Sequence, residues 1–313
     1  MDAPAPDVDV ILPTLDCAGT LRRCLTAVRA QRYGGRLLVT VVDGGSRDDT
    51  VAVAREFGAT VHANPGQYGT GLTGSRHFGE VRTNAPLVWL LDADNRPTTP
   101  TVAASLVGAL TSDPSIQVAV PTLDVPGHQG SFSRWLAWIE ETAIEAEAAR
   151  GRPVDGRFEV DRLGHGISNG SMIRRTALVA AGGYDSDVRL LDRLRRQGLA
   201  RGAIVPSAQI VHDQAEDLFH FGRKARARIV RFGGMSDAAL RAYFVDYPVP
   251  PSLEGDLRQR LQGGFLRAPW EGLAGWWRTG DRAWLWGITY PWIVLTVAAR
   301  HPWRSWRVYR RFL

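Results

Sequence analysis

Short, continuous runs of apolar and β-branched residues alternate with helix-patterned segments between Val8 and Val120 of this chain. Continuous apolar runs are typical of strands that are buried on both faces, as in parallel sheets. The predicted strands are Val8–Leu12, Leu37–Val42, Ala59–His62, Val88–Leu91 and Ile116–Val120. The predicted helices are Thr20–Arg32, Val51–Phe57, a segment that includes Arg76–Val81, and Val102–Leu110. The alternation predicts a Rossmann-like α/β fold, in which a mostly parallel sheet carries helices on both faces.

Polar and acidic residues stand where the predicted strands end. Thr14 and Asp16 follow the first strand, Asp43 ends the second, and Asp92 and Asp94 follow a later, strongly apolar run. In open α/β sheets the ligand site lies beyond the carboxyl ends of the strands, so these groups are expected to share one edge. Carboxylates that converge repel one another unless a cation lies between them. Mg²⁺ and Mn²⁺ prefer such oxygen ligands, so the pattern predicts a divalent-metal site.

The Asp92-Ala93-Asp94 pattern has a simpler alternative, a polar loop after a strand, because three-residue matches occur by chance in many chains. A second acidic strand end favours the metal site. There a Gly-Gly-Ser sequence follows Asp43, and glycine lets the backbone approach a ligand closely. Two strand ends with acidic tips are harder to explain by coincidence than one.

Composition argues against several classes of protein. The formal net charge is +6 and Lys224 is the only lysine among 38 basic residues, but no basic stretch has the pattern of a nucleic-acid-binding module. Cys17 and Cys24 are too few for a disulfide scaffold and lack the spacing of zinc ligands, so a reducing cytosol is expected. The opening MDAPAPDVDV has neither the basic nor the apolar region of a signal peptide.

Four motifs stand in order along the chain: PTLDCAGTLRRCLTAVRAQ, VVDGGSRDDT, SRHFG around Arg76, and WLLDADN. In this order they resemble the N-terminal half of glycosyltransferase family 2. The resemblance covers roughly residues 7–235. It implies a GT-A fold, a nucleotide-diphosphate sugar as donor, and a divalent metal, Mg²⁺ or Mn²⁺, as cofactor.

The resemblance also implies roles for residues of the donor half. Thr14 and Asp16 lie where the family contacts the nucleotide, although many members have Asn where this chain has Asp16. Asp43 matches the acidic residue that binds the nucleobase, and Arg76 matches an Arg that approaches the diphosphate. The full set of implied nucleotide-sugar-binding residues is Pro13, Thr14, Asp16, Asp43, Gly44, Ser46, Arg76, Asp92 and Ala93.

The implied metal ligands are Asp94, Asp92 and His212. By the resemblance, Asp94 ligates the metal and Asp92 faces the ribose or sugar side. In the family a His after the late strand often completes the metal shell, and His212 takes that position. His220 is the alternative, but it lies inside an apparent helix between two phenylalanines.

The segment GHGISNGSMIRRTALVAAGGYDSDVRLLDRLRRQG, residues 164–198, resembles the acceptor side of the family. In the family a helix here usually begins Glu-Asp, with an Arg six residues after the Asp and a Gly five further on. Matching Gly198 and Arg193 to that pattern leads to Asp187, which the resemblance implies as the general base for an acceptor hydroxyl. The usual Glu-Asp is Ser-Asp here and the preceding loop is short, so Asp185 and Asp192 are alternatives. An acid at the start of a helix also stabilises the helix, which is compatible with catalysis. The implied acceptor-side residues are Asn169, Gly170, Gly183 and Tyr184.

The C-terminal part differs in composition, since eight of the 11 tryptophans follow residue 265 and Ala283–Ala299 has no charged residue. A boundary is expected near residue 250, where YPVPPS breaks any helix. The predicted domains are a catalytic domain over 1–250, with a nucleotide-sugar-binding half at 7–120 and an acceptor-side half at 121–235, and a helical segment at 251–313. Tryptophans such as Trp284 and Trp286, with nearby arginines, suit a membrane surface, with a full span or a soluble appendage as alternatives.

These inferences predict a metal-dependent, inverting glycosyltransferase that moves a sugar from a nucleotide-diphosphate sugar to a lipid-linked or cell-envelope acceptor. A cytoplasmic location at the inner face of the cell membrane is expected from the basic tail. The alternatives are a polyprenyl-phosphate glycosyltransferase and a non-catalytic nucleotide-sugar-binding protein. Nucleotidylyl transfer fits less well, because the first strand lacks a basic, Gly-rich phosphate loop. No nucleic-acid partner is expected, and the sequence indicates no oligomeric state.

Overall fold

The computed structural model describes residues 4–69, 71–125, 127, 129–164, 170–184, 187–213 and 269–288. Contacts divide the chain into two compact units, Met1–Pro126 with Ile139–Asp213, and Gly127–Trp138 with Gln214–Leu313. Several predicted features lie outside the described residues: the boundary near residue 250, Asn169, Asp185 and His220. The other predicted site residues belong to the first unit.

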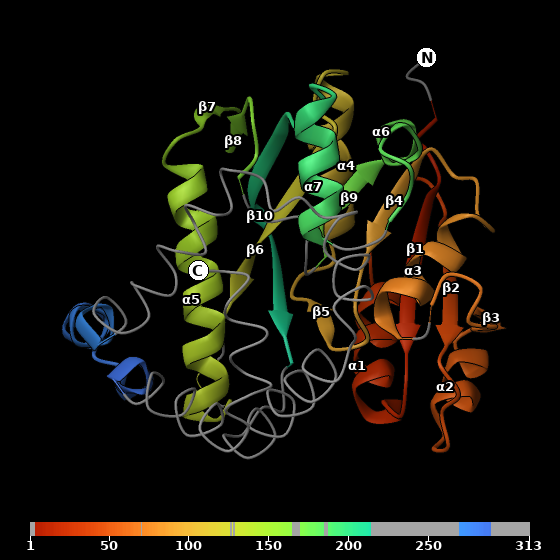
Figure 1. Cartoon of the computed structure of the whole chain (residues 1–313), viewed down its shortest axis with the longest axis horizontal. Helices are drawn as coiled ribbons and strands as arrows, with labels where there is room; N and C mark the ends of the chain where they lie inside the picture. Colours follow the sequence, from red (N-terminus) through yellow and green to blue (C-terminus); the bar gives the residue numbers. More distant parts are fainter. Residues whose placement is uncertain are drawn as a thin grey trace, which may run out of the picture. The chain divides into compact units, whose positions relative to one another are not determined.

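The first unit begins with a regular alternation of strands and helices (Figure 1). Its first elements are β1 (Val8–Thr14), α1 (Ala18–Arg29), β2 (Leu37–Asp43), α2 (Thr50–Glu56), β3 (Thr60–Ala63), α3 (Leu72–Glu80), β4 (Leu87–Leu90), β5 (Asn95–Pro97), α4 (Val102–Ser112) and β6 (Val118–Asp124). Every strand and helix predicted in this part of the chain is confirmed, with ends shifted by a few residues.

The second half of the first unit is less regular. After α5 (Ser131–Ala148) come β7 (Arg152–Val154), β8 (Arg157–Val160), β9 (Met172–Arg174), α6 (Arg175–Ala180), α7 (Asp187–Arg196) and β10 (Gly202–His212). The residues of α5 up to Trp138 cluster with the second unit. In that unit the structure also describes a helix over 269–279 and a short 3₁₀ helix, η1 (Arg282–Leu285).

One mixed sheet forms the centre of the first unit, so the expectation of a mostly parallel sheet is wrong in part. The strand order is β3-β2-β1-β4-β9-β6-β10-β8-β7, and β5 pairs with β10. The pairs β2–β3, β1–β2, β1–β4 and β6–β10 are parallel. The pairs β4–β9, β6–β9, β8–β10, β7–β8 and β5–β10 are antiparallel. The sequence pattern missed this because β9 has three residues, too few to show a period.

The two faces of the sheet bury two apolar cores. Alternate residues of β1 face opposite sides, because successive side chains of a strand do so. Val8, Val10 and Leu12 pack with apolar residues of α1, α2 and α4. Ile11 packs in the other core, which includes residues of α6 and α7. Helices therefore cover both faces of the sheet, as predicted.

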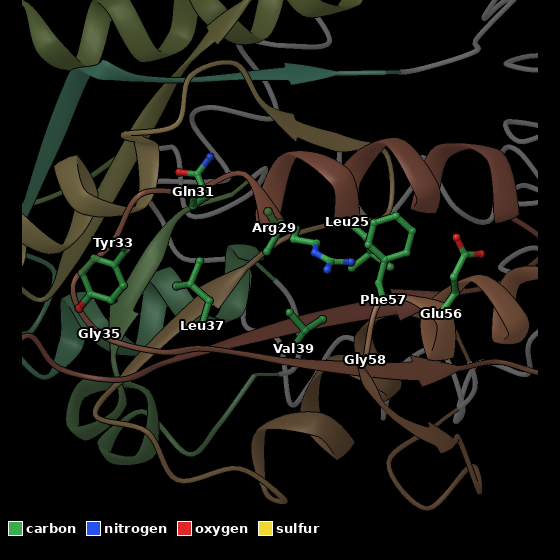
Figure 2. A pocket seen from close by; sticks show the side chains of 11 residues that line it. Leu25, Arg29, Gln31, Tyr33, Gly35, Leu37, Val39, Glu56, Phe57 and Gly58 are labelled. Atoms are coloured by element: carbon green, nitrogen blue, oxygen red, sulfur yellow. The ribbon is translucent and has the colours of Figure 1, made fainter.

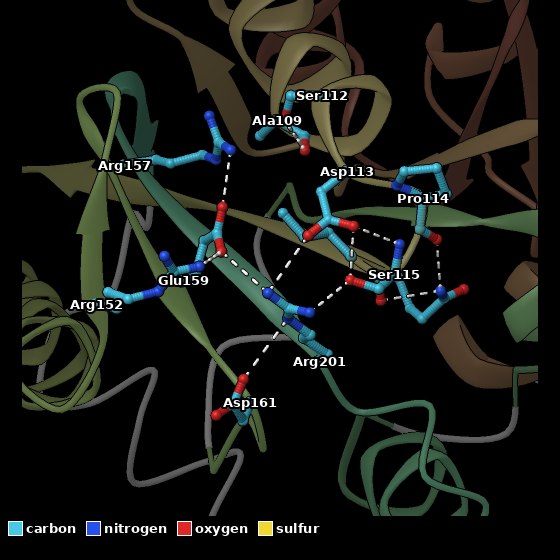
Figure 3. Close-up of polar contacts among 12 residues, drawn as sticks. Ala109, Ser112, Asp113, Pro114, Ser115, Arg152, Arg157, Glu159, Asp161 and Arg201 are labelled. Carbon is cyan, nitrogen blue, oxygen red and sulfur yellow. Dashed lines mark hydrogen bonds and ion pairs between the residues drawn. The ribbon is translucent and has the colours of Figure 1, made fainter.

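Charged residues gather at the amino-terminal end of β10, on the edge of the sheet opposite His212 (Figure 3). The carboxylate of Glu159 on β8 is buried and lies 2.7 Å from Arg152, 2.8 Å from Arg157 and 3.1 Å from Arg201. Arg201 also lies 3.3 Å from Asp113, just before β6. Burial raises the pKa of Glu159, but hydrogen bonds from Arg157 and Arg201 outweigh it and hold the pKa below its usual value. This cluster ties β8 and β10 to the start of β6.

We expect Glu159→Gln to destabilise the protein by about 2–3 kcal/mol, because it leaves three guanidinium groups without their buried carboxylate. The difference should vanish in acid. A carboxyl whose folded pKa is depressed contributes stability above its unfolded pKa of about 4.3, and loses it as the pH falls through the folded pKa. Urea denaturation between pH 7 and pH 3 measures this. Asp161→Asn is the control, because Asp161 is 96% exposed and lies 3.6 Å from Arg201. Equal stability of Glu159→Gln and wild type at pH 7 would contradict the expectation.

Candidate active site

The carboxyl ends of β1, β2, β4, β6 and β10 lie at one edge of the sheet. β1 is parallel to β2 and to β4, while β9 is antiparallel to both β4 and β6, and β6 is parallel to β10. These strands therefore run in one direction. In β1 and β2 the register places Thr14 opposite Asp43. The predicted acidic strand ends are thus brought to a common edge.

Asp43 is buried at the end of β2 and holds the turn that follows it. Its carboxylate accepts hydrogen bonds from the hydroxyl of Thr14 at 3.2 Å, the N–H of Gly45 at 3.0 Å, and both the N–H and the hydroxyl of Ser46. Burial raises the pKa of Asp43, but these hydrogen bonds outweigh it and lower the pKa below its usual value. An ionised carboxylate offers about four acceptor positions. The four donors therefore occupy the acceptor positions of the Asp43 carboxylate.

The neighbouring loops pack around Asp43. Gly44 donates its N–H to the carbonyl of Thr14 at 2.8 Å, and Pro13 is buried. Asp16 is exposed, has a φ of 47°, and accepts a hydrogen bond from the N–H of Arg47 at 2.7 Å. Its own N–H donates to the hydroxyl of Ser46 at 2.9 Å. The loops after β1 and β2 therefore support each other.

Asp92, Ala93 and Asp94 form a tight turn closed by the buried Asn95. The N–H of Asn95 donates to the carbonyl of Asp92, and the side-chain oxygen of Asn95 accepts from the N–H of Asp92, both at 2.9 Å. Ala93 is buried in the turn. The carbonyl of Asp94 accepts the N–H of Asp213 at 2.6 Å. These hydrogen bonds fix the backbone from which both carboxylates project.

His212, the last residue of β10, lies between two carboxylates. Its Nε2 atom is 3.3 Å from Oδ2 of Asp94, and its Nδ1 atom is 3.8 Å from Oε2 of Glu140 on α5. Burial lowers the pKa of His212, but the interactions with Asp94 and Glu140 outweigh it and raise the pKa from 6.5 to about 10. Without a metal, a protonated imidazole would supply positive charge between the two carboxylates.

The donor set fits the divalent metal that the predicted chemistry requires. Among the residues that the structure describes, no three His, Cys, Asp or Glu side chains cluster closely enough to hold a metal ion by themselves. Mg²⁺ and Mn²⁺ are commonly held by one or two protein ligands together with substrate phosphates. Asp94 and His212 offer one carboxylate and one imidazole, and a divalent cation could replace the proton of His212. Glu140 is placed to orient the imidazole, as carboxylates often do for metal-bound histidines.

Arg76, on α3, is fully buried at 1% exposure. The approach to the diphosphate that the resemblance implies for it stays a prediction. The Arg76 guanidinium donates to Oδ1 of Asp92 at 2.8 Å and to the hydroxyl of Tyr184 at 2.6 Å. One oxygen of the Asp92 carboxylate is therefore held by Arg76. In this geometry the buried Arg76 positions the Asp92 carboxylate.

The acceptor-side residues that the structure describes lie on two turns. Gly170 has a φ of 87°, and a Cβ atom there would lie 2.1 Å from Ile210, so only glycine fits. Gly183 and Tyr184 form the turn before α7. Asp187 begins α7, as predicted, and its side chain lies outside the described part. Asp192 on the same helix pairs with Arg196 at 2.8 Å.

Sequence reasoning missed Glu140, Glu141 and Asp213. Asp213 accepts hydrogen bonds from Arg23 at 3.1 Å and Arg96 at 3.3 Å. Burial raises the pKa of Glu141 to about 7, and its carboxylate accepts the N–H of Leu123 at 2.6 Å. Consecutive glutamates in a helix resemble any solvated face, and no sequence signal pairs them with a strand end far along the chain.

A hollow of about 520 Å³ lies between α1, β2 and the end of α2 (Figure 2). Apolar side chains such as Leu25, Leu37 and Phe57 line it, with Arg29 and Glu56 among the polar ones. None of the predicted site residues lines it. It is therefore separate from the carboxylate edge.

The fold is an α/β fold, and residues suited to bind a divalent metal lie at the carboxyl ends of its parallel strands. The chain belongs to glycosyl transferase family 2, whose family model matches residues 9–182, more than half of its length. An uncharacterized glycosyltransferase of Mycobacterium tuberculosis is 34% identical over 106 residues, which are 34% of this chain and 40% of that protein. The glycosyltransferase AglE of Haloferax volcanii is 32% identical over 107 residues, 31% of this chain and 33% of that protein. The chain thus matches well under half the length of these relatives.

Solved structures share the fold. The mannosyltransferase PcManGT from Pyrobaculum calidifontis, solved in complex with GDP-Man and Mn²⁺, has a TM-score of 0.56 and 18% identity, over 95% of this chain and 87% of its own. Glucosyl-3-phosphoglycerate synthase from Mycobacterium tuberculosis, solved in complex with phosphoglyceric acid, has a TM-score of 0.51 and 22% identity, over 76% of this chain and 79% of its own. At these identities the likeness establishes a GT-A-like α/β fold.

Proposed function

We propose that this protein is a metal-dependent, inverting glycosyltransferase that uses a nucleotide-diphosphate sugar. The observation that carries the proposal is the placement of Asp94 beside His212, next to Asp92, at the edge where Thr14 and Asp43 also lie. This edge offers two side chains that could bind a metal and a polar turn that could bind a nucleotide. Family membership and the Mn²⁺ complexes of proteins with the same fold support it.

In the proposed reaction the chain's own residues bind, orient and move one proton. Asp94 and His212 would hold the metal, which supplies positive charge against the departing diphosphate. Arg76 holds Asp92 in place. Asp187 would accept the proton of the acceptor hydroxyl as it attacks the anomeric carbon. The attack from the side opposite the leaving diphosphate inverts the configuration of the sugar.

Release of nucleoside diphosphate from a panel of UDP-, GDP- and dTDP-sugars tests the proposal. We expect nucleoside diphosphate to be released from one class of donor in the presence of Mn²⁺. Release should be slow when water is the only acceptor and faster when an acceptor for the sugar is added. Folded protein that releases nothing from any donor would favour the alternative of a non-catalytic nucleotide-sugar-binding protein. Stronger stimulation by a polyprenyl phosphate than by a hydroxyl acceptor would favour the polyprenyl-phosphate alternative.

We further propose a lipid-linked or cell-envelope acceptor and a cytoplasmic site at the membrane surface. Among the described residues, no helix is both long and apolar enough to cross a bilayer, and Ala283–Ala299 is described only to residue 288. Trp284 differs from the expectation of an interfacial residue, because it is buried with Phe132 and Trp135. Instead the helix 269–279 exposes Trp270 at 71% and Trp277 at 89%, with Leu273 and Trp276 also exposed.

Spacing and residue type both favour a lipid surface as the partner of this helix. Trp270, Leu273 and Trp277 follow the i, i+3, i+7 pattern of one helical face. Tryptophan is enriched at the membrane–water interface, where its ring is apolar and its N–H stays hydrated. The sequence that follows, RHPWRSWRVYRRFL, adds arginines that suit anionic head groups.

We expect Trp270→Ser with Trp277→Ser to weaken binding to anionic phospholipid vesicles at least about 10-fold. Burying a large apolar side chain contributes roughly 1.5–3 kcal/mol, and 1.4 kcal/mol is a factor of 10. Vesicle sedimentation measures the bound fraction. Val179→Ser is the control, because Val179 is 61% exposed on α6 of the first unit. Equal binding of the double variant and the control would contradict a lipid contact at this helix.

A further inference from the structure

Helix α3 contacts both the predicted donor side and the predicted acceptor side. Arg76 reaches Asp92 and Tyr184, and Glu80, one turn later, accepts the N–H of Tyr184 at 2.7 Å. His77 lies between them, with Nδ1 3.3 Å from the Glu80 carboxylate. Consecutive turns of one helix therefore hold two parts of the site that are far apart in sequence.

The interactions of Arg76 are strong ones for a protein interior. Its side chain is 1% exposed, so its charge is almost fully removed from water. Hydrogen bonds that involve an ionised group are roughly twice as strong as neutral ones. The guanidinium carbon also lies 5.0 Å from the centre of the Tyr184 ring, within the range of a cation–π interaction. Tyr184 thus contacts Arg76 through both its hydroxyl and its ring.

The turn that carries Tyr184 fits closely against α3. Gly183 has a φ of 82°, and a Cβ atom there would lie 2.4 Å from the His77 ring. Helix α3 itself lies close to the sheet, since a Cβ atom at Gly79 would lie 2.8 Å from Ile11. The position of Arg76 is therefore set by close packing on both sides.

The same turn is joined to α7, which begins at the candidate base Asp187. Arg193 of α7 donates to the carbonyl of Gly183 at 2.6 Å and to the carbonyl of Ala181. Leu190 and Leu194 of α7 are fully buried in the same apolar core as Tyr184. A shift of this turn would consequently move α7 and the Arg76 side chain together.

We infer that Tyr184 is a positioning residue: through Arg76 it fixes the Asp92 carboxylate, and it links the turn before α7 to the donor side of the site. The catalytic role of Tyr184 rests on the proposed function. The contacts from Tyr184 through Arg76 to Asp92 belong to the fold and do not depend on it.

Tyr184→Phe tests the link, because it removes the hydroxyl and keeps the ring. We expect Tyr184→Phe to lower the ratio of folded to unfolded protein. Asp92→Asn should lower the same ratio. The double variant should lose at least about 3-fold less than the product of the two single losses, because both changes act on one guanidinium. Urea denaturation of the four proteins measures this without any ligand. Independent, multiplying losses would overturn the link.

The catalytic role of Tyr184 is tested separately by affinity for UDP, GDP and dTDP in Mn²⁺. We expect Tyr184→Phe to bind the nucleotide preferred by the wild type about 3–10-fold more weakly, and its KM for the donor to rise more than its kcat falls. Tyr33→Phe is the control, since the Tyr33 hydroxyl donates to the carbonyl of Pro6 beside the separate hollow. Unchanged affinity in Tyr184→Phe would overturn the positioning role. Wild-type protein that binds none of the three nucleotides would overturn the proposed function, while the unfolding measurement still decides the link.

Discussion

Asp94→Asn should lower the turnover of donor sugar by about 10³-fold and abolish the dependence of nucleotide binding on Mn²⁺. Asp94 is the carboxylate that lies 3.3 Å from His212, and the amide would supply a neutral oxygen in its place. Lewis-acid stabilisation by a bound metal is worth several kcal/mol in the transition state, and about 4 kcal/mol corresponds to this loss of rate. The isosteric change keeps the turn closed by Asn95.

Two measurements separate this expectation from a general loss of structure. Asp161→Asn is the matched control, because it makes the same chemical change at a 96% exposed carboxylate near the other edge of the sheet. Isothermal titration with nucleotide, with Mn²⁺ and with chelator, then compares the two variants. An Asp94→Asn protein that keeps metal-dependent binding would show that the metal is held elsewhere.

Asp187→Asn should lower turnover by about 10²- to 10⁴-fold for an acceptor with a hydroxyl group, with nucleotide affinity unchanged. The range is that of a positioned general base. Asp187 begins α7, beside the turn that carries Tyr184. Steady-state kinetics and calorimetry on the same variant distinguish loss of chemistry from loss of binding.

The result for Asp187→Asn also reports on the acceptor. A polyprenyl phosphate is already anionic and needs no strong base, so a mild effect with that acceptor would favour the polyprenyl-phosphate alternative. Asp192→Asn is the control on the same helix, where Asp192 pairs with Arg196. A large loss in Asp192→Asn together with unchanged turnover in Asp187→Asn would move the role of the base to Asp192.

Sequence reasoning predicted the first half of the fold well, because its strands and helices are long enough to show a period. The run VDVIL and the helix behind it are examples. The prediction of a mostly parallel sheet was wrong in part, because the short strand β9 pairs antiparallel with both β4 and β6 and contributes only three residues. Such a short strand is specified by its tertiary neighbours, and no local sequence pattern predicts it.

The candidate site shows the same division between local and tertiary information. The acidic strand ends and His212 were named from motif order, and their place near strand ends is confirmed: Asp43 and His212 end β2 and β10, and Asp92 and Asp94 follow β4. The burial of Arg76 against Tyr184 could not be predicted, because the partners are 108 residues apart. Glu140 faces His212 from a helix whose register against β10 depends on the folded core. Trp284 was assigned to a membrane interface by composition, whereas packing against Phe132 and Trp135 buries it.

Calorimetric titration of the wild-type protein with UDP, GDP and dTDP, in Mn²⁺ and in chelator, decides whether the carboxyl edge of the sheet is a metal-dependent nucleotide site. We expect one of these nucleotides to bind, and chelation to remove most of its affinity, because Asp94 and His212 would hold the metal that meets the diphosphate. Binding of none of them to folded protein, or binding that is equal in chelator, would contradict this expectation.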